Sequence, residues 1–348
     1  MPAVSAFVRA LPKIQLHCHL EGTVRAETFR DLAALRRVES ARAAGPLAAT
    51  YAFATFREFL LTFAEVCKAL QQPEDYARIA REYARDAAAQ RVCYAEVFIS
   101  PSVWRYFHHD LDVAETVAAI RTALDGEGAA HDLEVKLICD LTRNFGTERA
   151  FETARGAVEL AEAGLGVVGI GLGGDEVNFP PSPYREAFDY ARAHGLRCVA
   201  HAGEAAGPQS VRGAVEVLHA ERIGHGVRAI EDPALVTELA ERHIALEVCP
   251  TSNHLTAAVA PGEPHPLIAF DAAGIRCAID ADDPALFSTT LSGEYALVAS
   301  WLGEAALPRF VRHAIDASFA DAARKAALHQ KLDAYGLETV GTRRSSSS

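Results

Sequence analysis

The sequence predicts an α/β fold, specifically a (β/α)8 TIM barrel, and three observations support this. Short apolar runs rich in valine and isoleucine alternate with amphipathic stretches about eight times along the chain. The runs are apolar throughout, as in parallel strands that are covered on both faces. Polar clusters stand at the carboxyl ends of these runs, and such ends share one rim in a parallel barrel. The rival architecture is an open doubly wound sheet.

The expected strands are 14–19, 92–99, 134–141, 167–172, 197–202, 222–226, 245–250 and 277–281. The stretches between them, such as 74–90 and 151–163, carry apolar residues three and four apart and are expected to be helices. We expect one catalytic domain over residues 1–336, because a single barrel accounts for all eight units. The polar segment 337–348, which ends T-R-R-S-S-S-S, is expected to be a disordered tail.

Composition narrows the class of partner. The net charge is −12, from 34 basic and 46 acidic residues, which argues against a nucleic-acid partner. No run approaches the roughly 20 apolar residues of a membrane span. The seven cysteines form no C-x-x-C pair and suit buried, reduced thiols, so we expect a cytoplasmic location. The oligomeric state stays open.

Two histidines lie one residue apart in the stretch L-H-C-H-L-E-G (16–22), at the end of the first expected strand. Because side chains in a strand alternate between faces, His17, His19 and Glu21 are expected to point the same way. Neighbouring imidazoles on one face can chelate a metal ion. A pair of surface histidines is the alternative interpretation.

Two further strand ends carry residues that suit a metal. His201 ends the run R-C-V-A-H, and Asp280, Asp282 and Asp283 lie in D-A-D-D-P at the end of the eighth run. Three buried acids would repel one another unless a divalent cation relieved the repulsion. A hydrogen-bonded turn at His201 and an exposed turn that caps the next helix at Pro284 are the alternatives.

Candidates for acid–base chemistry lie at the same rim. Glu204 follows His201 by three residues in H-A-G-E, and His225 stands between two glycines in R-I-G-H-G-V. The stretch G-I-G-L-G-G (169–174) matches a dinucleotide-binding pattern, but the three prolines that follow exclude the helix which that pattern needs. A glycine-rich turn whose N–H groups approach a flat ligand is the better interpretation.

Six ordered motifs resemble the adenosine deaminase family of the amidohydrolase superfamily. They span residues 11 to about 295 and read L-P-K-I-Q-L-H-C-H-L-E-G-T, G-G-D-E, H-A-G-E, E-R-I-G-H-G-V, V-C-P-T-S-N and D-A-D-D-P. The resemblance implies a barrel that holds one Zn²⁺ ion and hydrolytically deaminates a small 6-aminopurine nucleoside. The zinc ligands that it implies are His17, His19, His201 and Asp282.

The resemblance also implies roles for the residues around the metal. Glu204 is similar to the acid that protonates the purine nitrogen next to the attacked carbon, and His225 to the residue that orients the attacking hydroxide. Asp283 is similar to the acid that hydrogen-bonds the nucleophile and the imidazole nitrogen of the purine. Substrate contacts are expected from His19, Glu21, Gly174 and Asp283.

Two positions depart from the family's best-known members, which often carry aspartate where Glu21 and Gly171 stand. Both lie where sugar recognition is expected. The H-L-E-G form resembles relatives that use adenine, or 6-aminodeoxyfutalosine in menaquinone synthesis. Trp104 and Arg105 are candidates to meet the aromatic carboxylate of the latter, and segment 51–63 is a candidate hydrophobic lid. An ordinary loop and simple helix packing are the respective alternatives.

The first-choice prediction is deamination of adenosine or 2′-deoxyadenosine to inosine or 2′-deoxyinosine plus ammonia. The alternative substrates are 6-aminodeoxyfutalosine and then adenine. A non-catalytic nucleoside-binding protein is a different class, and the presence of Glu204 and every implied zinc ligand argues against it. A hydrolase of another amide or phosphoester on the same barrel is also compatible with the fold.

Overall fold

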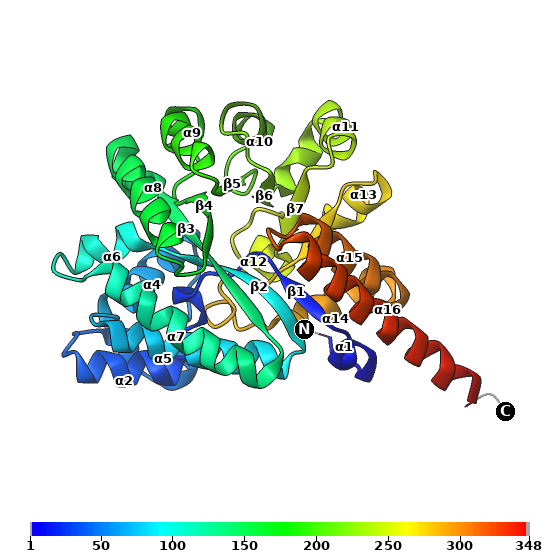
Figure 1. Cartoon of the computed structure of the whole chain (residues 1–348), viewed down its shortest axis with the longest axis horizontal. Helices are drawn as coiled ribbons and strands as arrows, with labels where there is room; N and C mark the ends of the chain where they lie inside the picture. Colours follow the sequence, from blue (N-terminus) through cyan, green and yellow to red (C-terminus); the bar gives the residue numbers. More distant parts are fainter. Residues whose placement is uncertain (1, 346–348) are drawn as a thin grey trace.

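Eight parallel strands form the centre of the computed structural model, which describes residues 2–345 apart from the side chains of residues 56 and 337–345. Neighbours in the sheet follow chain order from β1 to β8. The strands are β1 (Lys13–Gln15), β2 (Val92–Ile99), β3 (Glu134–Thr142), β4 (Val167–Gly173), β5 (Arg197–Ala202), β6 (Arg222–His225), β7 (Ala245–Val248) and β8 (Cys277–Ile279). Helices surround this sheet (Figure 1). The (β/α)8 barrel is therefore confirmed, and the open doubly wound sheet is excluded.

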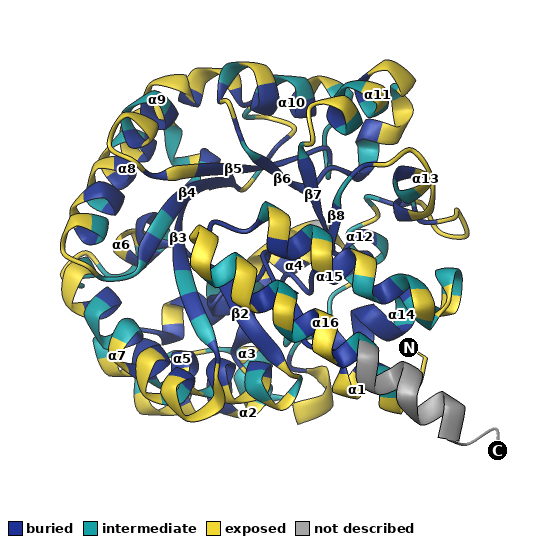
Figure 2. Ribbon diagram, turned by 45° about the vertical axis from the view of Figure 1, so that its right-hand side comes forward, coloured by how far each residue is buried: buried dark blue, intermediate teal, exposed yellow. Residues whose placement is uncertain are grey.

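The helices are α1 (Ala6–Ala10), α2 (Ala26–Leu35), α3 (Ala41–Ala44), α4 (Phe56–Ala69), α5 (Pro73–Ala89), α6 (Pro101–Phe107), α7 (Val113–His131), α8 (Gly146–Glu162), α9 (Arg185–Ala193), α10 (Pro208–Arg212), α11 (Pro233–Glu241), α12 (Pro250–Leu255), α13 (Leu267–Ala272), α14 (Leu291–Leu302), α15 (Leu307–Ala317) and α16 (Ala322–Ser345). Their buried faces turn toward the strands, and their exposed faces form the outer surface (Figure 2). Among the described residues, no helix combines the length and apolarity that a membrane crossing requires. The expected domain boundary at 336 falls inside α16, and residues 346–348 lie outside the described residues.

Local sequence signals account for the helix boundaries. Helix α5 begins with Pro73 at its first turn, and the side chains of Gln72 and Asp75 form a reciprocal capping box. Along this helix Tyr76 and Tyr83 are among the buried residues, as the helical spacing of apolar positions predicts.

The barrel closes at the two ends of the sheet through isolated contacts next to the expected metal ligands. Cys18 forms a parallel bridge with Asp282, the N–H of His19 donates to the carbonyl of Asp282 at 3.0 Å, and the N–H of Asp282 donates to the carbonyl of His17 at 3.1 Å. The expected first strand, 14–19, is longer than the regular ladder of β1, which ends at Gln15. The reason is a side chain, because Asp280 Oδ1 accepts the N–H groups of Leu16 and His17.

A buried ionic cluster fills the barrel interior near the start of β6. Arg222 pairs with Glu96 at 2.6 Å and with Glu247 at 2.5 Å, and its guanidinium lies 3.7 Å from the ring centroid of Phe319. Phe319 packs with apolar residues of β2, β3 and β5. Buried charges of this kind are tolerated only when they are paired. The cluster places Glu247 directly beneath the histidines of the rim.

Candidate active site

A cavity of about 270 Å³ opens at the carboxyl ends of the strands. Its walls come from the ends of β3 to β6, from the segments that follow β2 and β8, and from helices α4 and α6. The cavity thus lies where a parallel barrel carries catalytic residues. It collects most of the residues that the sequence singled out, namely His19, Gly174, His201, Glu204, His225, Asp282 and Asp283.

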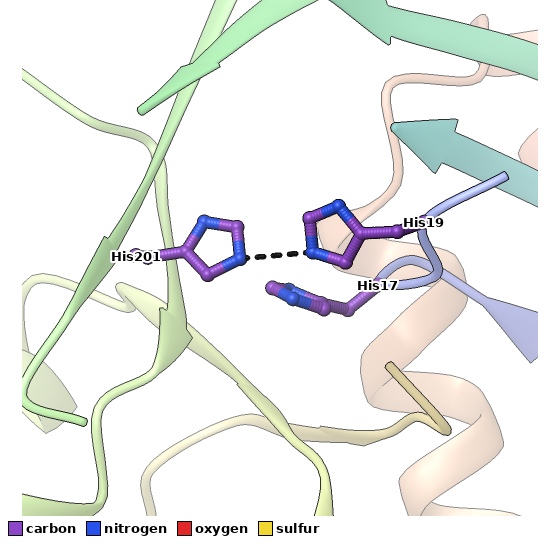
Figure 3. A group of neighbouring side chains, drawn as sticks. All are labelled: His17, His19 and His201. Atoms are coloured by element: carbon purple, nitrogen blue, oxygen red, sulfur yellow. Dashed lines mark hydrogen bonds between the residues drawn. The ribbon is translucent and has the colours of Figure 1, made fainter. Parts of the chain in front are cut away.

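His19, His201 and Asp282 of the cavity converge with His17, which lies beneath them, as the ligands of one metal ion would. Figure 3 shows His19 facing His201, with their Nε2 atoms 3.1 Å apart, and His17 next to both. Asp282 Oδ1 lies 3.6 Å from His17 Nε2 and 3.5 Å from His19 Nε2. Ligand arms of roughly 2.1 Å give a tetrahedron with edges of about 3.4 Å, so the spacing suits zinc.

The chemistry of the donors supports the same conclusion. His17 Nε2 is buried without a hydrogen-bond partner, while its Nδ1 lies 2.8 Å from Glu247 Oε2. A carboxylate on one ring nitrogen leaves the lone pair of the other free for a metal. Ser252 donates to Asp282 Oδ2 at 2.6 Å and leaves Oδ1 for the ion. The four residues therefore fit a metal ion such as zinc, and their role as its ligands stays a prediction.

Glu204 is held at the cavity wall by a carboxylate that sequence reasoning overlooked. Glu176 accepts the N–H groups of four consecutive residues, from Gly203 to Ala206. These bonds fix the turn H-A-G-E. Burial, together with the nearby charges of Asp282 and Glu176, raises the pKa of Glu204 to about 8. Its carboxyl is consequently protonated at neutral pH and can donate a proton.

His225 ends β6 in a left-handed backbone conformation, with φ of 60°, and Asp282 has φ of 61°. Non-glycine residues rarely adopt this conformation, and such strain is concentrated at functional sites. His225 Nε2 lies 3.7 Å from Glu204 Oε2 and 4.0 Å from Asp282 Oδ2. Burial lowers the pKa of His225 to about 3, so the ring is neutral.

Asp283 and Gly174 border the same cavity. Asp283 Oδ1 is buried without a hydrogen-bond partner, and burial beside Asp282 raises the pKa of Asp283 well above its usual range. Gly174 has φ of +95°, and a Cβ there would lie 2.4 Å from Asn144 Oδ1. Only glycine fits this turn.

Glu21 does not continue the alternation of His17 and His19. The chain turns into a 3-10 helix, Glu21–Thr23, so the expectation that the three side chains point the same way is wrong. Glu21 is fully buried, and its Oε1 accepts hydrogen bonds from the N–H of Ser100 at 3.0 Å and from Trp104 Nε1 at 2.6 Å. Its substrate-binding role stays a prediction.

The expected pair Trp104 and Arg105 does not face the cavity. Trp104 is buried against Glu21, and Arg105 borders a different hollow, between α6 and α8. The neighbours of this pair on α6 line the cavity instead: Val103, Tyr106 and Phe107. The two sets of residues face different sides of α6, because successive side chains on a helix are rotated by about 100° around its axis.

An aromatic mouth surrounds the outer part of the cavity. It consists of Phe59 and Phe63 on α4, Tyr106 and Phe107 on α6, and Phe145 after β3. Tyr106 stacks on Phe145 with ring centroids 5.1 Å apart. Lys68 on α4 places its Nζ 5.3 Å from the centroid of Phe107. The expected hydrophobic segment 51–63 thus contributes to the cavity through α4.

Asp140 is a further cavity residue that sequence reasoning missed. It lies on β3 opposite Gly171, is only 5% exposed, and has no hydrogen-bond partner for Oδ1. A Cβ at Gly173 would lie 2.6 Å from Asp140 Oδ2, so the glycines of G-I-G-L-G-G make room for this carboxyl group. Burial raises the pKa of Asp140 to about 7. An acidic residue in the apolar run V-K-L-I-C-D was the available signal.

Comparisons with known proteins show the family to which the chain is similar. The family model described as adenosine deaminase matches residues 12–335. An aminodeoxyfutalosine deaminase from Streptomyces avermitilis is 38% identical over 95% of this chain and 92% of its own length. An adenine deaminase from Rhodospirillum rubrum is 36% identical over 94% and 98% of the two chains.

One solved structure of a similar protein contains a metal ion. An amidohydrolase from Burkholderia ambifaria with bound zinc is 30% identical, covers 98% of each chain and superposes with a TM-score of 0.86. Neither of the two named enzymes is an adenosine deaminase, so the alternative substrates are better supported than adenosine, our first choice from the sequence. The matched family model and these relatives identify the chain as a deaminase of the adenosine deaminase family.

Proposed function

We propose that this protein hydrolytically deaminates 6-aminodeoxyfutalosine, a purine nucleoside whose sugar carries an aromatic carboxylate. The observation that carries the proposal is the aromatic mouth, which extends the cavity beyond the polar centre that a purine would occupy. Aromatic rings favour offset or edge contacts with another ring, and Lys68 beside Phe107 supplies a cation for a carboxylate. The similarity to aminodeoxyfutalosine deaminase supports the same substrate.

The polar centre suits the chemistry of deamination. A zinc ion held by His17, His19, His201 and Asp282 would lower the pKa of a water molecule and supply hydroxide near neutral pH. Glu204, protonated in its buried position, donates a proton to the ring nitrogen beside the carbon that bears the amino group. The carbon that bears the amino group would then take up the hydroxide. The proton of this hydroxyl would pass to the amino group, which leaves as ammonia, and the proton that the water lost would return to Glu204.

The remaining residues orient the reactants. His225 lies within reach of both Glu204 and Asp282 and directs the attacking oxygen. Asp283, whose pKa is raised by burial beside Asp282, hydrogen-bonds the imidazole side of the purine. The N–H groups around Gly174 approach the opposite edge of the base. We also propose a cytoplasmic location, which the seven free and buried cysteines support.

Adenine is the second candidate substrate, and a separate observation favours it. Phe98 and Asp140 fill the space above Gly171, a position where family members that bind a sugar often carry aspartate. The similarity to an adenine deaminase over nearly the whole chain agrees with this candidate.

An absorbance assay on the zinc-loaded protein separates the candidates. We expect the kcat/KM for 6-aminodeoxyfutalosine to exceed those for adenine and adenosine by about tenfold or more, since about 1.4 kcal/mol of extra contact in the mouth is enough. Adenine as the fastest substrate would replace the first candidate by the second. No ammonia release from any of the three compounds would overturn both.

A further inference from the structure

We propose that His265 and Asn253 are positioning residues that hold His225 in one tautomer, with its proton on Nε2. The three residues form a buried chain of hydrogen bonds behind the cavity, with exposures of 3% for His265, 0% for Asn253 and 1% for His225. The consequence for the reaction rests on the proposed deaminase function, whereas the tautomer itself follows from the hydrogen bonds alone.

The chain of hydrogen bonds starts at a backbone N–H, a group that can act only as a donor. The N–H of Leu267, the first residue of α13, points at His265 Nδ1 at 3.1 Å. A backbone N–H can only donate, so Nδ1 of His265 must be the accepting nitrogen. The N–H groups in the first turn of a helix need acceptors outside the helix, and His265 supplies one. Burial lowers the pKa of His265 to about 3, so the neutral ring carries its one proton on Nε2.

The donor and the acceptor of each following hydrogen bond are then determined in turn. His265 Nε2 lies 3.2 Å from Asn253 Oδ1, and Asn253 Nδ2 lies 3.0 Å from His225 Nδ1. Since Nε2 of His265 donates, the amide oxygen of Asn253 must face it, and the amide NH2 must face His225. The opposite amide orientation would set two donors against each other. Nδ1 of His225 therefore accepts, and its proton is on Nε2.

The protonated nitrogen faces the reacting groups. His225 Nε2 lies 3.7 Å from Glu204 Oε2 and 4.0 Å from Asp282 Oδ2, on the side of the cavity. In this tautomer His225 donates a hydrogen bond to the attacking oxygen and cannot take a proton from it. The backbone amide of α13 thus determines, through two side chains, which role His225 plays. His265 is itself held by Trp301, whose ring stacks on it at 5.4 Å.

The first test is spectroscopic and does not depend on turnover. Nitrogen-15 NMR of the zinc-loaded protein, labelled at histidine and assigned with His225→Gln, reports which ring nitrogen carries the proton. We expect a protonated Nε2 and an unprotonated Nδ1 for His225. A proton on Nδ1 would overturn the proposal even if the enzyme deaminates its substrate as proposed, and a protein without deaminase activity would still give this readout.

The second test reverses the tautomer. In Asn253→Asp the carboxylate can only accept, so a neutral His225 must move its proton to Nδ1 and turn a bare Nε2 to the cavity. Protonation of the ring at low pH restores the Nε2 proton. We expect the kcat of the variant, divided by that of the wild type, to fall by about tenfold per pH unit above the pKa of this ring, with KM and zinc content unchanged.

Controls separate this effect from a structural one. The titratable groups that face His225 are His17, His19, His201, Glu204, Glu247 and Asp282, and all are the same in both proteins. Gln330→Glu makes the same change from amide to carboxylate at an exposed residue of α16 and is expected to keep the wild-type pH profile. A loss of kcat in Asn253→Asp that is equal at every pH would show that Asn253 only supports the fold and would overturn the proposal.

Discussion

Glu204 combines two properties at the residue scale, a place in the cavity wall and a pKa raised to about 8. Replacement by glutamine keeps the size of the side chain but removes the proton that the ring nitrogen needs. We expect Glu204→Gln to lower kcat by about 10³-fold while zinc content stays at the wild-type level. Steady-state kinetics and metal analysis measure the two quantities.

The pH profile of the wild type gives an independent check on Glu204. The acid acts while protonated, so kcat/KM falls as the pH rises through its pKa, and a bound cation moves that limb to pH 8 or below. Glu216→Gln, at an exposed glutamate, serves as the control. Turnover within tenfold of the wild type in Glu204→Gln would refute the acid role.

Asp140 lowers the stability of the folded protein at neutral pH, because burial disfavours its charged form. Its pKa is raised from 3.8 to about 7, so the folded state holds its proton more tightly than the unfolded chain does. Stability therefore falls as the pH rises from about 4 to 7, by on the order of 4 kcal/mol at most. We expect Asp140→Asn to raise the Tm of the metal-free protein at pH 8 but to change it little at pH 4.5. Asp110→Asn, at an exposed aspartate, controls for the loss of charge; an equal gain at both pH values would contradict the prediction.

At the scale of elements, the strands that the sequence predicted well are the ones with regular ladders. Expected strands 92–99 and 197–202 coincide with β2 and β5, because an apolar run with polar flanks determines their ends. The first strand was predicted too long. The N–H groups of Leu16 and His17 donate to the side chain of Asp280, which lies more than 260 positions away in the chain, and not to a neighbouring strand. The directions of Glu21 and Trp104 could not be read from the sequence for the same kind of reason, since a 3-10 turn and a helix decide where they point.

The residues of the site fall into the same two groups: those that the local sequence indicates and those that contacts between distant elements position. The proposed metal ligands and Glu204 were indicated by the strand ends on which they lie and by motifs that resemble those of the family. Glu176, Glu247, Asn253 and His265 act through hydrogen bonds between elements, which a single sequence does not reveal. Buried acidic residues inside apolar runs, such as Glu247 in A-L-E-V, are the signal that comes nearest to showing them.

The 3-10 helix after His19 packs against the segment that follows β8 with no spare room. A Cβ at Gly22 would lie 1.9 Å from Asp283 Oδ1, so Gly22→Ala must displace this carboxyl group. We expect kcat/KM to fall by about 100-fold or more, because a misplacement of about 1 Å has that effect. Gly126→Ala, in the open interior of α7, should keep full activity and raise the free energy of unfolding by about 0.5–1 kcal/mol. Wild-type activity in Gly22→Ala would contradict the assigned position of Asp283.

Helix α4 brings a cation to the aromatic mouth. If Lys68 meets the carboxylate of an aromatic substituent, Lys68→Met should lower kcat/KM for 6-aminodeoxyfutalosine by about 3- to 10-fold, as for an exposed ion pair, and leave adenine unaffected. Added salt should likewise reduce the preference of the wild type for 6-aminodeoxyfutalosine over adenine, because salt screens the ion pair. Lys136→Met, on β3 away from the cavity, is the control. An equal loss with both substrates would show that Lys68 supports α4 itself.

At the scale of the whole molecule, the proposed metal ligands lie at both ends of the sheet, where the barrel closes. His17 and His19 follow β1, Asp282 follows β8, and His201 ends β5, so one ion would tie the closing contact to the opposite side of the sheet. His17, His19 and His201 form one candidate ligand group, and His19 forms another with Asp282 and Asp283. Binding of a cation to the folded state alone stabilises it by mass action.

Zinc should therefore raise the Tm of the metal-free protein. The Tm should keep rising with the logarithm of free zinc, while the bound zinc should saturate at one ion per chain. The histidines must be unprotonated to bind, so the gain in Tm should be larger at pH 7.5 than at pH 5.5. His19→Ala should abolish most of the gain, whereas His194→Ala, at an exposed histidine, should keep it. Differential scanning calorimetry with metal analysis measures both quantities. A gain that survives in His19→Ala, or that is equal at both pH values, would place the ion elsewhere and remove the basis for the hydroxide chemistry at this rim.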